Sequence, residues 1–428
     1  MKTTLWRLPS FRNLWAAQTV SLLGTQVTLL ALPLTALLLL DASALEVSML
    51  AAVEFLPVLL LGLPAGAWVE RLPLRPVLIL TDVLRAVALL VVPAAVWLDL
   101  LSMPVLYGAA FAVGLGTLFF DVAQLSYLPE IVEEDRLVDA NGKLELSRSV
   151  AQFAGPGSGG LLVQAFSAPV AILLDALSYL VSAGFLLGVK GKGRVIEEQP
   201  SQGMGREIAE GMRFVFSHPL LRPLIVCAAI AELAFAAVLA LQVVFAADEL
   251  SLRADVIGIV LAVGNVGGLL GAVAAGPLAQ RVGTGPAFLV SIVLFSGGAV
   301  ILPMSAGPVT FGAGLFVVYV GAVTFNVLQV SLCQTVTPTR LLGRMNSVFR
   351  FVTWGTVPLG AALGGLLVAP IGLRGVFWIA AVLTVISLLP PLFSPLRGTR
   401  DETPGDETPG DEPPPDEQLQ SAPTGETS

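Results

Sequence analysis

Residues 14–40 read LWAAQTVSLLGTQVTLLALPLTALLLL, a run of 27 residues without a charged side chain. An α-helix needs about 20 apolar residues to cross the roughly 30 Å hydrocarbon core of a bilayer. The run is also longer than the short apolar core of a cleaved secretory signal. This stretch is therefore predicted to form a membrane-spanning helix.

Eleven further stretches of the same character follow, separated by charged or Pro/Gly-rich breaks. Only helices and closed barrels satisfy every backbone hydrogen bond in lipid, and unbroken apolar runs of this length favour helices. The predicted fold is an all-α membrane protein with twelve transmembrane helices in two six-helix halves, at about 14–40, 47–69, 74–98, 103–127, 145–166, 169–189, 221–247, 255–279, 286–304, 308–335, 346–369 and 373–394.

The composition excludes a soluble enzyme. Hydrophobic residues make up 55% of the 428 residues and charged residues 13%, with a mean hydropathy of +0.84, whereas soluble proteins carry about 25% charged residues. The net charge of −8 comes from residues 401–428, which contain nine acidic residues and no basic one. The other 22 acidic residues (31 minus nine) face 23 basic ones, so the membrane body is nearly neutral.

Basic residues indicate the orientation in the membrane. Twenty of the 23 lie at the N-terminus, near Arg400 or in loops on the same predicted side, whereas Arg253 and Arg374 lie on the other side and Arg85 within a span. Because cytoplasmic loops are enriched in Lys and Arg, both termini are predicted to be cytoplasmic.

Internal similarity indicates duplication of a six-helix unit. Residues 124–126 (QLS) and 159–163 (GGLLV) have counterparts 205 residues later at 329–331 (QVS) and 364–368 (GGLLV). The predicted units are an N-terminal half (1–189), a cytoplasmic connector with an amphipathic helix (190–220), a C-terminal half (221–397) and a disordered acidic Pro/Gly-rich tail (398–428).

Two motifs carry a resemblance to a known family. Residues 66–75 (GAWVERLPLR) resemble the G-x-x-x-D-R-x-G-R-R loop of the major facilitator superfamily, with Glu70 in place of Asp and Pro73 where Gly is usual. Gly155, Pro156, Gly159 and Gly160 resemble a helix-5 motif of its antiporters. Residues 11–15, 81–85 and 126–129 look like the branch containing macrolide efflux proteins and the enterobactin exporter. The resemblance implies a monomeric transporter that works by alternating access.

One departure from a related antiporter branch concerns proton coupling. That branch carries an arginine within helix 4 that is implicated in proton handling, but residues 105–128 contain no basic residue. Proton coupling cannot be inferred here by that route.

Charged residues near the cytoplasmic ends of the spans form a candidate gate between the halves. An ion pair gains strength when a closing interface excludes water, so such pairs could hold the cytoplasmic side shut. The alternative is that they are ordinary cytoplasmic anchors. The set comprises Glu70, Arg71, Arg75, Asp82, Arg85, Asp121, Arg148, Arg344 and Arg350.

Acidic residues within the spans are candidate proton carriers. A charge near the middle of a bilayer costs about 2.5–3.5 kcal/mol, so each needs a reason. Glu54 and Glu232 have no basic neighbour in the sequence, and burial favours the protonated form of a carboxyl group. The alternative is a static hydrogen bond between helices, which we favour for Asp175 because it shares a stripe with Ser178 and Ser182.

Polar and aromatic stripes on the first, fourth, seventh and tenth predicted spans (14–40, 103–127, 221–247 and 308–335) form a candidate substrate cavity. The resemblance implies that these spans line the central cavity. The alternative is polar contact between neighbouring helices. The candidates are Gln18, Thr25, Tyr107, Phe111, Phe235, Gln242, Tyr319, Asn326 and Gln329. Their mostly apolar mixture suits a bulky amphiphile better than a sugar or an inorganic ion.

The sequence thus predicts a secondary transporter of the bacterial inner membrane that exports an amphiphilic, drug- or macrolide-like compound in exchange for protons. Export of a siderophore or lysolipid is the alternative within this fold, and a transport-inactive receptor or assembly subunit is the alternative outside it. No P-loop, His cluster or thiolate pair is present, so we expect no enzyme activity, cofactor or metal, and no nucleic-acid partner.

Overall fold

The computed structural model describes residues 5–69, 71–133, 136–191, 204–338 and 341–395. Within these ranges the secondary structure is helical and includes no strand, which confirms the predicted all-α membrane class. Glu70 and the acidic tail lie outside the described residues.

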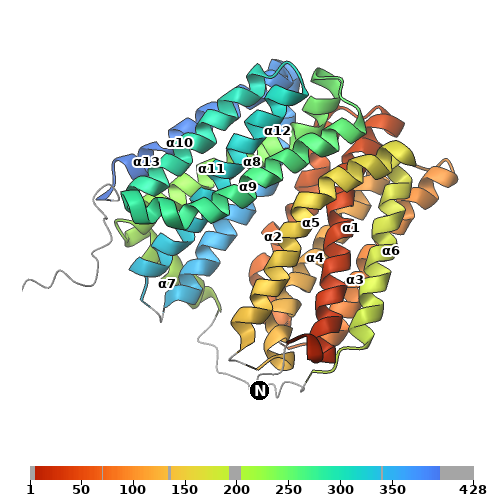
Figure 1. Cartoon of the computed structure of the whole chain (residues 1–428), viewed down its shortest axis with the longest axis horizontal. Coiled ribbons are helices and arrows are strands. Elements are labelled where there is room, and N and C mark those ends of the chain that lie inside the picture. The colour runs from red at the N-terminus through yellow and green to blue at the C-terminus, as the bar shows by residue number, and fades with distance from the viewer. Residues whose placement is uncertain (1–4, 70, 134–135, 192–203, 339–340, 396–428) are drawn as a thin grey trace, which may run out of the picture.

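The N-terminal half consists of six long helices that run back and forth (Figure 1). A short 3-10 turn, η1 (Leu5–Arg7), precedes them. They are α1 (Pro9–Leu40), α2 (Ala44–Val69), α3 (Leu74–Trp97), α4 (Met103–Ile131), α5 (Leu137–Ala165) and α6 (Ala168–Leu187).

The C-terminal half follows the connector helix α7 (Met204–Ser217). Its elements are α8 (Leu221–Val244), the π-helical segment η3 (Phe245–Glu249), α9 (Ala254–Val282), α10 (Thr284–Ile301), the 3-10 turn η4 (Leu302–Met304), α11 (Pro308–Val336), α12 (Leu342–Ser387) and α13 (Leu389–Leu392). The backbone of α12 leaves the helical conformation at Gly372, with φ of 73°. Because glycine adopts positive φ readily, α12 is two helices that meet at this residue.

Ten helices among the described residues are long and apolar enough to cross a membrane. The helix α5 is not one of them, although its 29 residues give it sufficient length. The break at Gly372 falls between the last two predicted spans. The count of twelve transmembrane helices therefore stays a prediction. It requires that α5 and both parts of α12 cross the membrane.

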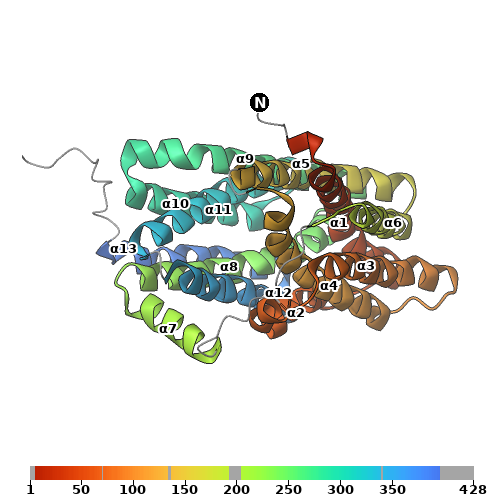
Figure 2. The same ribbon diagram turned by 90° about the horizontal axis from the view of Figure 1, so that it is seen from below.

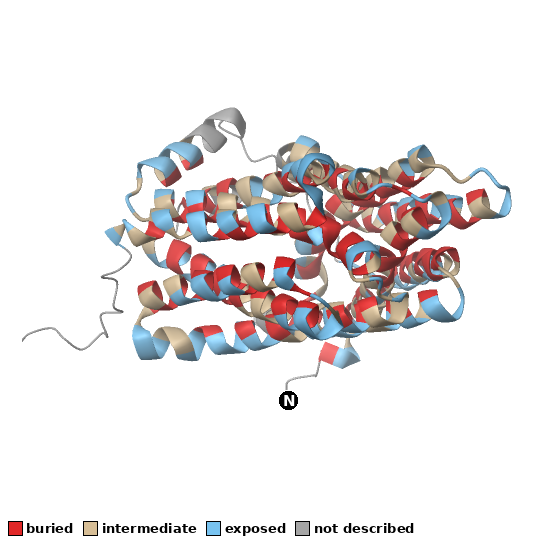
Figure 3. Cartoon of the chain, turned by 90° about the horizontal axis from the view of Figure 1, so that it is seen from above, coloured by how far each residue is buried: buried red, intermediate tan, exposed pale blue. Residues whose placement is uncertain are grey.

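The outer surface is apolar, as expected for contact with lipid tails. On α3, Leu80, Leu84, Val87 and Val91 are exposed at helical spacing, whereas Asp82 and Arg85 on the opposite face are buried. Figure 3 shows exposed residues along the outer faces of the other helices as well. The charged side chains of α3 point into the bundle and its apolar side chains point outward, which is the arrangement that a lipid environment favours.

The two halves form adjacent bundles (Figures 1 and 2) that meet through two helix pairs. The helix α2 packs on α12, and α5 packs on α9. The bundle has an α7 end, where α1 begins, and an opposite end, where α5 is followed by α6 (Figure 1). A ligand site can lie between these two contacts.

The connector helix α7 docks on the C-terminal half rather than between the halves. It packs on α12 and α8, where Val215 is fully buried and Glu210 forms an ion pair with Arg344. Met212 and Phe216 remain exposed on the same helix. An apolar exposed face of this kind is typical of a helix that lies at a membrane surface.

Candidate substrate cavity

A cavity of about 570 Å³ lies between the two halves. The helices α1, α2 and α5 contribute one wall, and α8, α9, α10 and α11 contribute the other. Its volume falls within the roughly 300–1,000 Å³ of pockets that hold drug-sized ligands. A site shared by both halves is one that a relative movement of the halves would open and close.

The periodicity of α8 places four side chains in this cavity. Glu232, Phe235, Leu239 and Gln242 follow one another at steps of three or four residues, and all four line the wall. Residues at these steps share one face of a helix. The sequence predicted this face, and the structure places it on the cavity.

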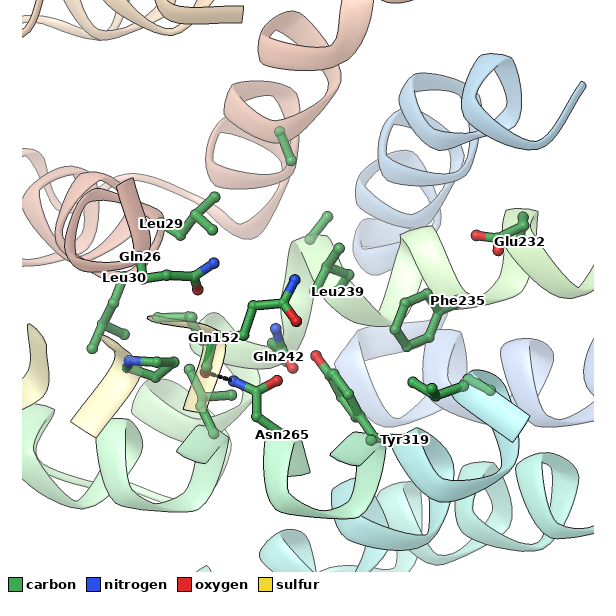
Figure 4. Close-up of a pocket in the computed structure, with 18 of the residues that line it drawn as sticks. Gln26, Leu29, Leu30, Gln152, Glu232, Phe235, Leu239, Gln242, Asn265 and Tyr319 are labelled. Carbon is green, nitrogen blue, oxygen red and sulfur yellow. Dashed lines mark hydrogen bonds between the residues drawn. The ribbon is translucent and has the colours of Figure 1, made fainter. Parts of the chain in front are cut away.

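Amide and phenol groups from several helices gather at one end of the cavity (Figure 4). They belong to Gln26 on α1, Gln152 on α5, Gln242 on α8, Asn265 on α9 and Tyr319 on α11. The Asn265 side-chain amide donates a hydrogen bond to the backbone carbonyl of Gln152, which joins α9 to α5 across the two halves. Such a set offers donors and acceptors within an otherwise apolar wall.

Three carboxyl groups line the same cavity, and the described lining residues include no lysine, arginine or histidine. Glu54 comes from α2, Glu232 from α8 and Glu145 from α5. The Glu145 side chain is 71% exposed and lies 3.8 Å from Arg148. Glu54 and Glu232, the two predicted proton carriers, therefore lie in one cavity although they belong to different halves.

The position of Glu54 is fixed by close backbone packing. A Cβ atom at Gly114 of α4 would overlap the Glu54 carbonyl oxygen, so α2 and α4 touch at this point. Glu54 has an electrostatic interaction with Asp175. It also lines a second cavity of about 310 Å³ between α2, α4 and α12, together with Asp121, Arg350 and Trp354.

Four of the predicted cavity residues line the cavity, namely Phe235, Gln242, Tyr319 and Asn326. The other predicted residues lie outside its described lining: Gln18, Thr25, Tyr107, Phe111 and Gln329. No residue of α4 is among the described lining residues of this larger cavity. The helices α2, α5, α9 and α10, which were not predicted to line it, contribute to it.

The polar stripe of α1 explains part of this difference, because it faces the interior of the N-terminal half. Gln124 donates a 2.9 Å hydrogen bond to Gln18, and the hydroxyls of Thr25 and Tyr179 lie 2.8 Å apart. The cavity instead receives Gln26, together with Thr28. The residues one turn from Gln26 on α1 are all leucines, at positions 22, 23, 29 and 30. No periodic signal in the sequence marks such an isolated amide.

The predicted gate residues Asp82 and Arg85 pair with each other inside the N-terminal half. Their exposed fractions are 0% and 4%. Ser182 donates a 2.6 Å hydrogen bond to Asp82, and the Arg85 guanidinium lies 4.4 Å from the Phe120 ring centre and 4.3 Å from that of Tyr179. The pair joins α3 to α4 and α6, as part of a single bundle.

The remaining gate residues make mostly local contacts. Arg75 donates to the carbonyl oxygens of Leu186 and Leu187, Arg71 is exposed, and the Arg350 guanidinium lies 4.9 Å from the Trp354 ring centre. Asp121 interacts electrostatically with Arg148 and with Arg350 of the other half. Asp121 and Arg350 are thus the predicted gate residues that face one another across the second cavity.

Asp175 lies behind the cavity wall and is 1% exposed. It accepts a 3.0 Å hydrogen bond from Ser178, and a side chain at Gly24 of α1 would overlap both residues. The polar stripe of α6 that contains Asp175 and Ser178 therefore packs against α1.

The glycines of the helix-5 motif allow α5 to touch both halves. A Cβ at Gly155 or Gly159 would crowd Gln26 or Val27 of α1, and a Cβ at Gly160 would overlap the backbone of α9 near Gly258. We call the contact between Gly160 and Gly258 the glycine seam. It closes the two halves together toward the opposite end of the bundle.

Metal ligation finds no support in the described residues, where no three His, Cys, Asp or Glu side chains are grouped. Cys227 and Cys333 are buried and free.

Comparison with known proteins connects this architecture with transport. A family model described as "transmembrane secretion effector", of the major facilitator superfamily, matches residues 4–422. The multidrug efflux pump Tap of Mycolicibacterium fortuitum is 28% identical over 88% of this chain and 93% of its own length.

Two solved structures share the fold. The nucleoside transporter NupG matches with a TM-score of 0.76 at 11% identity, covering 89% of this chain and 98% of that one. A bacterial homologue of the iron transporter ferroportin in its inward-facing state matches with a TM-score of 0.73 at 19% identity, covering 91% and 99%. The family match extends over nearly all of the membrane body, and the chain therefore belongs to the transmembrane secretion effector family of major facilitator superfamily transporters.

Proposed function

We propose that this transporter exports an amphiphilic, drug-like compound in exchange for protons. The observation that carries the proposal is the cavity between the halves, which holds Glu54 and Glu232 in mostly apolar walls. The similarity to Tap, a multidrug efflux pump, supports a drug-like cargo.

The walls favour an amphiphile as cargo. Phe235 packs edge-on against Phe295 and Tyr319, with ring centres 5.9 Å and 5.6 Å apart. These rings offer apolar contact area, and the amides at the other end of the cavity offer hydrogen bonds (Figure 4). Most of the lining residues are apolar, which suits an amphiphile better than a sugar.

The two acids give a physical route to exchange. A carboxylate in an apolar wall is unfavourable unless it binds a proton or a counter-ion. If cargo can bind only after the proton leaves, binding of the two is linked with opposite sign. A pH gradient would then drive cargo uphill.

Alternating access requires contacts that open and close at either end of the cavity. The glycine seam closes the halves toward the opposite end, and Asp121 and Arg350 are the charges placed to close the α7 end. We propose that the α7 end is cytoplasmic, in agreement with the basic residues of the sequence, and that the protein is a monomer of the bacterial inner membrane.

The test uses purified protein in proteoliposomes with an acidic interior. We expect the parent protein to accumulate at least one compound from a panel of fluorescent drugs, siderophores and lysolipids above the level of protein-free vesicles. Glu54→Gln or Glu232→Gln should abolish this accumulation, even at concentrations at which the compound still binds. Glu46→Gln is the matched control, because Glu46 lies on α2 with Glu54 but accepts hydrogen bonds from Ser43 outside the cavity.

Accumulation by both cavity variants at the parent level would contradict the proposed coupling. Absence of accumulation by the parent for every compound in the panel would contradict proton-driven export of such cargo.

A further inference from the structure

The charge of the cavity is one-sided. Glu54, Glu145 and Glu232 line it, and no basic residue is among its described lining residues. Arg148 lies near Glu145 at 3.8 Å, and Arg350 belongs to the second cavity. The inner part of the cavity, where Glu54 and Glu232 lie, has no positive side chain in its described lining.

Glu232 has no protein partner that would neutralise its charge. Among the described residues it forms no ion pair and no hydrogen bond, and it is half-buried in the cavity wall. A carboxylate in an apolar wall is unfavourable unless it is neutralised, which is why charges at such sites are normally paired. A group with positive charge supplied by a ligand would remove this cost.

A buried acceptor in the same wall also lacks a regular partner. Gln242 is 7% exposed and interacts with the Tyr319 hydroxyl, yet its amide oxygen makes no hydrogen bond of regular geometry. Gln242 lies almost three helical turns from Glu232 on the cavity face of α8 (Figure 4). The partial negative charge of this oxygen adds to that of the carboxylates.

Aromatic rings lie between these two acceptors. Phe235 is three residues from Glu232, and Tyr319 and Phe295 pack on it. The face of an aromatic ring attracts a cation, and the attraction is strongest when water is excluded. The carboxylate of Glu232 and the rings of Phe235 and Tyr319 together suit a cation with apolar substituents.

We propose that the cargo is a lipophilic cation, whose positive charge lies beside Glu232 while its apolar groups contact Phe235 and Tyr319. Glu54 on the facing half is the second counter-charge. This inference rests on the proposed function for the idea that the cavity holds cargo, and it adds the sign of the cargo's charge.

The test compares two probes of nearly equal shape and opposite charge, tetraphenylphosphonium and tetraphenylborate. Binding to the full-length protein in nanodiscs of zwitterionic lipid is measured by equilibrium dialysis, with protein-free nanodiscs as the background. We expect the cation to bind at least tenfold more tightly than the anion.

Variants locate the binding charge. Glu232→Gln should weaken tetraphenylphosphonium binding about tenfold, Glu232→Asp should retain most of it because the charge is kept, and Glu46→Gln should leave it unchanged. Equal or tighter binding of the anion, no binding of the cation by the parent, or parent-like cation affinity in Glu232→Gln would overturn the inference. The unfolding temperature of each variant, measured in the same samples, reports whether it is folded.

The outcomes also separate this inference from the proposed function. Proton-driven export of neutral or anionic amphiphiles, with no preference for cations, would refute the inference and leave the exporter intact. Tight cation binding without uphill transport would leave the inference and refute the exporter.

Discussion

Charged residues within the membrane body occur in two regions that differ in how they are paired. In the N-terminal half, Asp82 and Arg85 pair with each other, and Ser182 donates to the acid. In the cavity, Glu232 has no such partner among the described residues. The pair in the first region links helices of one bundle, and we propose that the unpaired acid of the second serves a ligand or a proton.

The largest expected effect comes from breaking the paired region. Arg85→Met leaves Asp82 buried without its counter-charge, and such a loss typically costs about 3–5 kcal/mol. We expect a sharp fall in unfolding temperature and in yield. The double variant Asp82→Leu with Arg85→Met should recover much of the stability, because no isolated charge remains. A single variant as stable as the parent protein would show that the pair does not hold the bundle.

The glycine seam should show a smaller effect, on transport more than on folding. Gly160→Ala places a methyl group against the α9 backbone, so the halves cannot close fully toward the opposite end. We expect transport to fall about tenfold, which corresponds to about 1.4 kcal/mol. Gly184→Ala is the matched control, because nothing lies within 4 Å of its Cβ position. Equal activity of the two variants would remove the seam from the mechanism.

The unpaired region should give the smallest change in stability, and of opposite sign to the paired region. Glu232→Gln replaces a carboxylate without a partner by a neutral amide of the same shape. We expect the free energy of unfolding to stay the same or rise by about 1 kcal/mol, measured in parallel with Arg85→Met. A loss comparable to that of Arg85→Met would mean that Glu232 braces two helices.

The sequence predicted the fold class well because the relevant signal is physical and local. Apolar runs long enough to cross a bilayer must be helical, and the breaks between them set the element order. The boundary within α12 was also predictable, since the predicted spans 346–369 and 373–394 flank Gly372, where the helix breaks.

The site was predictable only in part. On α8 one face carries Glu232, Phe235 and Gln242, and its periodicity was sufficient to predict that these residues line the cavity. On α1 the polar stripe was visible in the sequence, but its partner was not, because both a cavity and a neighbouring helix such as α6 favour hydroxyl and amide groups. Which of them receives Thr25 depends on how α1 is rotated in the bundle, and that is set by contacts such as Gly24 against Asp175.

The central claim is that the cavity acids exchange protons for cargo, and proton release on binding tests it most directly. Tetraphenylphosphonium is added to the parent protein in weakly buffered nanodiscs near neutral pH, and a pH indicator reports the protons released. We predict that the parent releases protons in proportion to the cation bound and that the Glu54→Gln, Glu232→Gln double variant releases none. Equal release by both proteins, or cation binding by the parent without any release, would contradict the account.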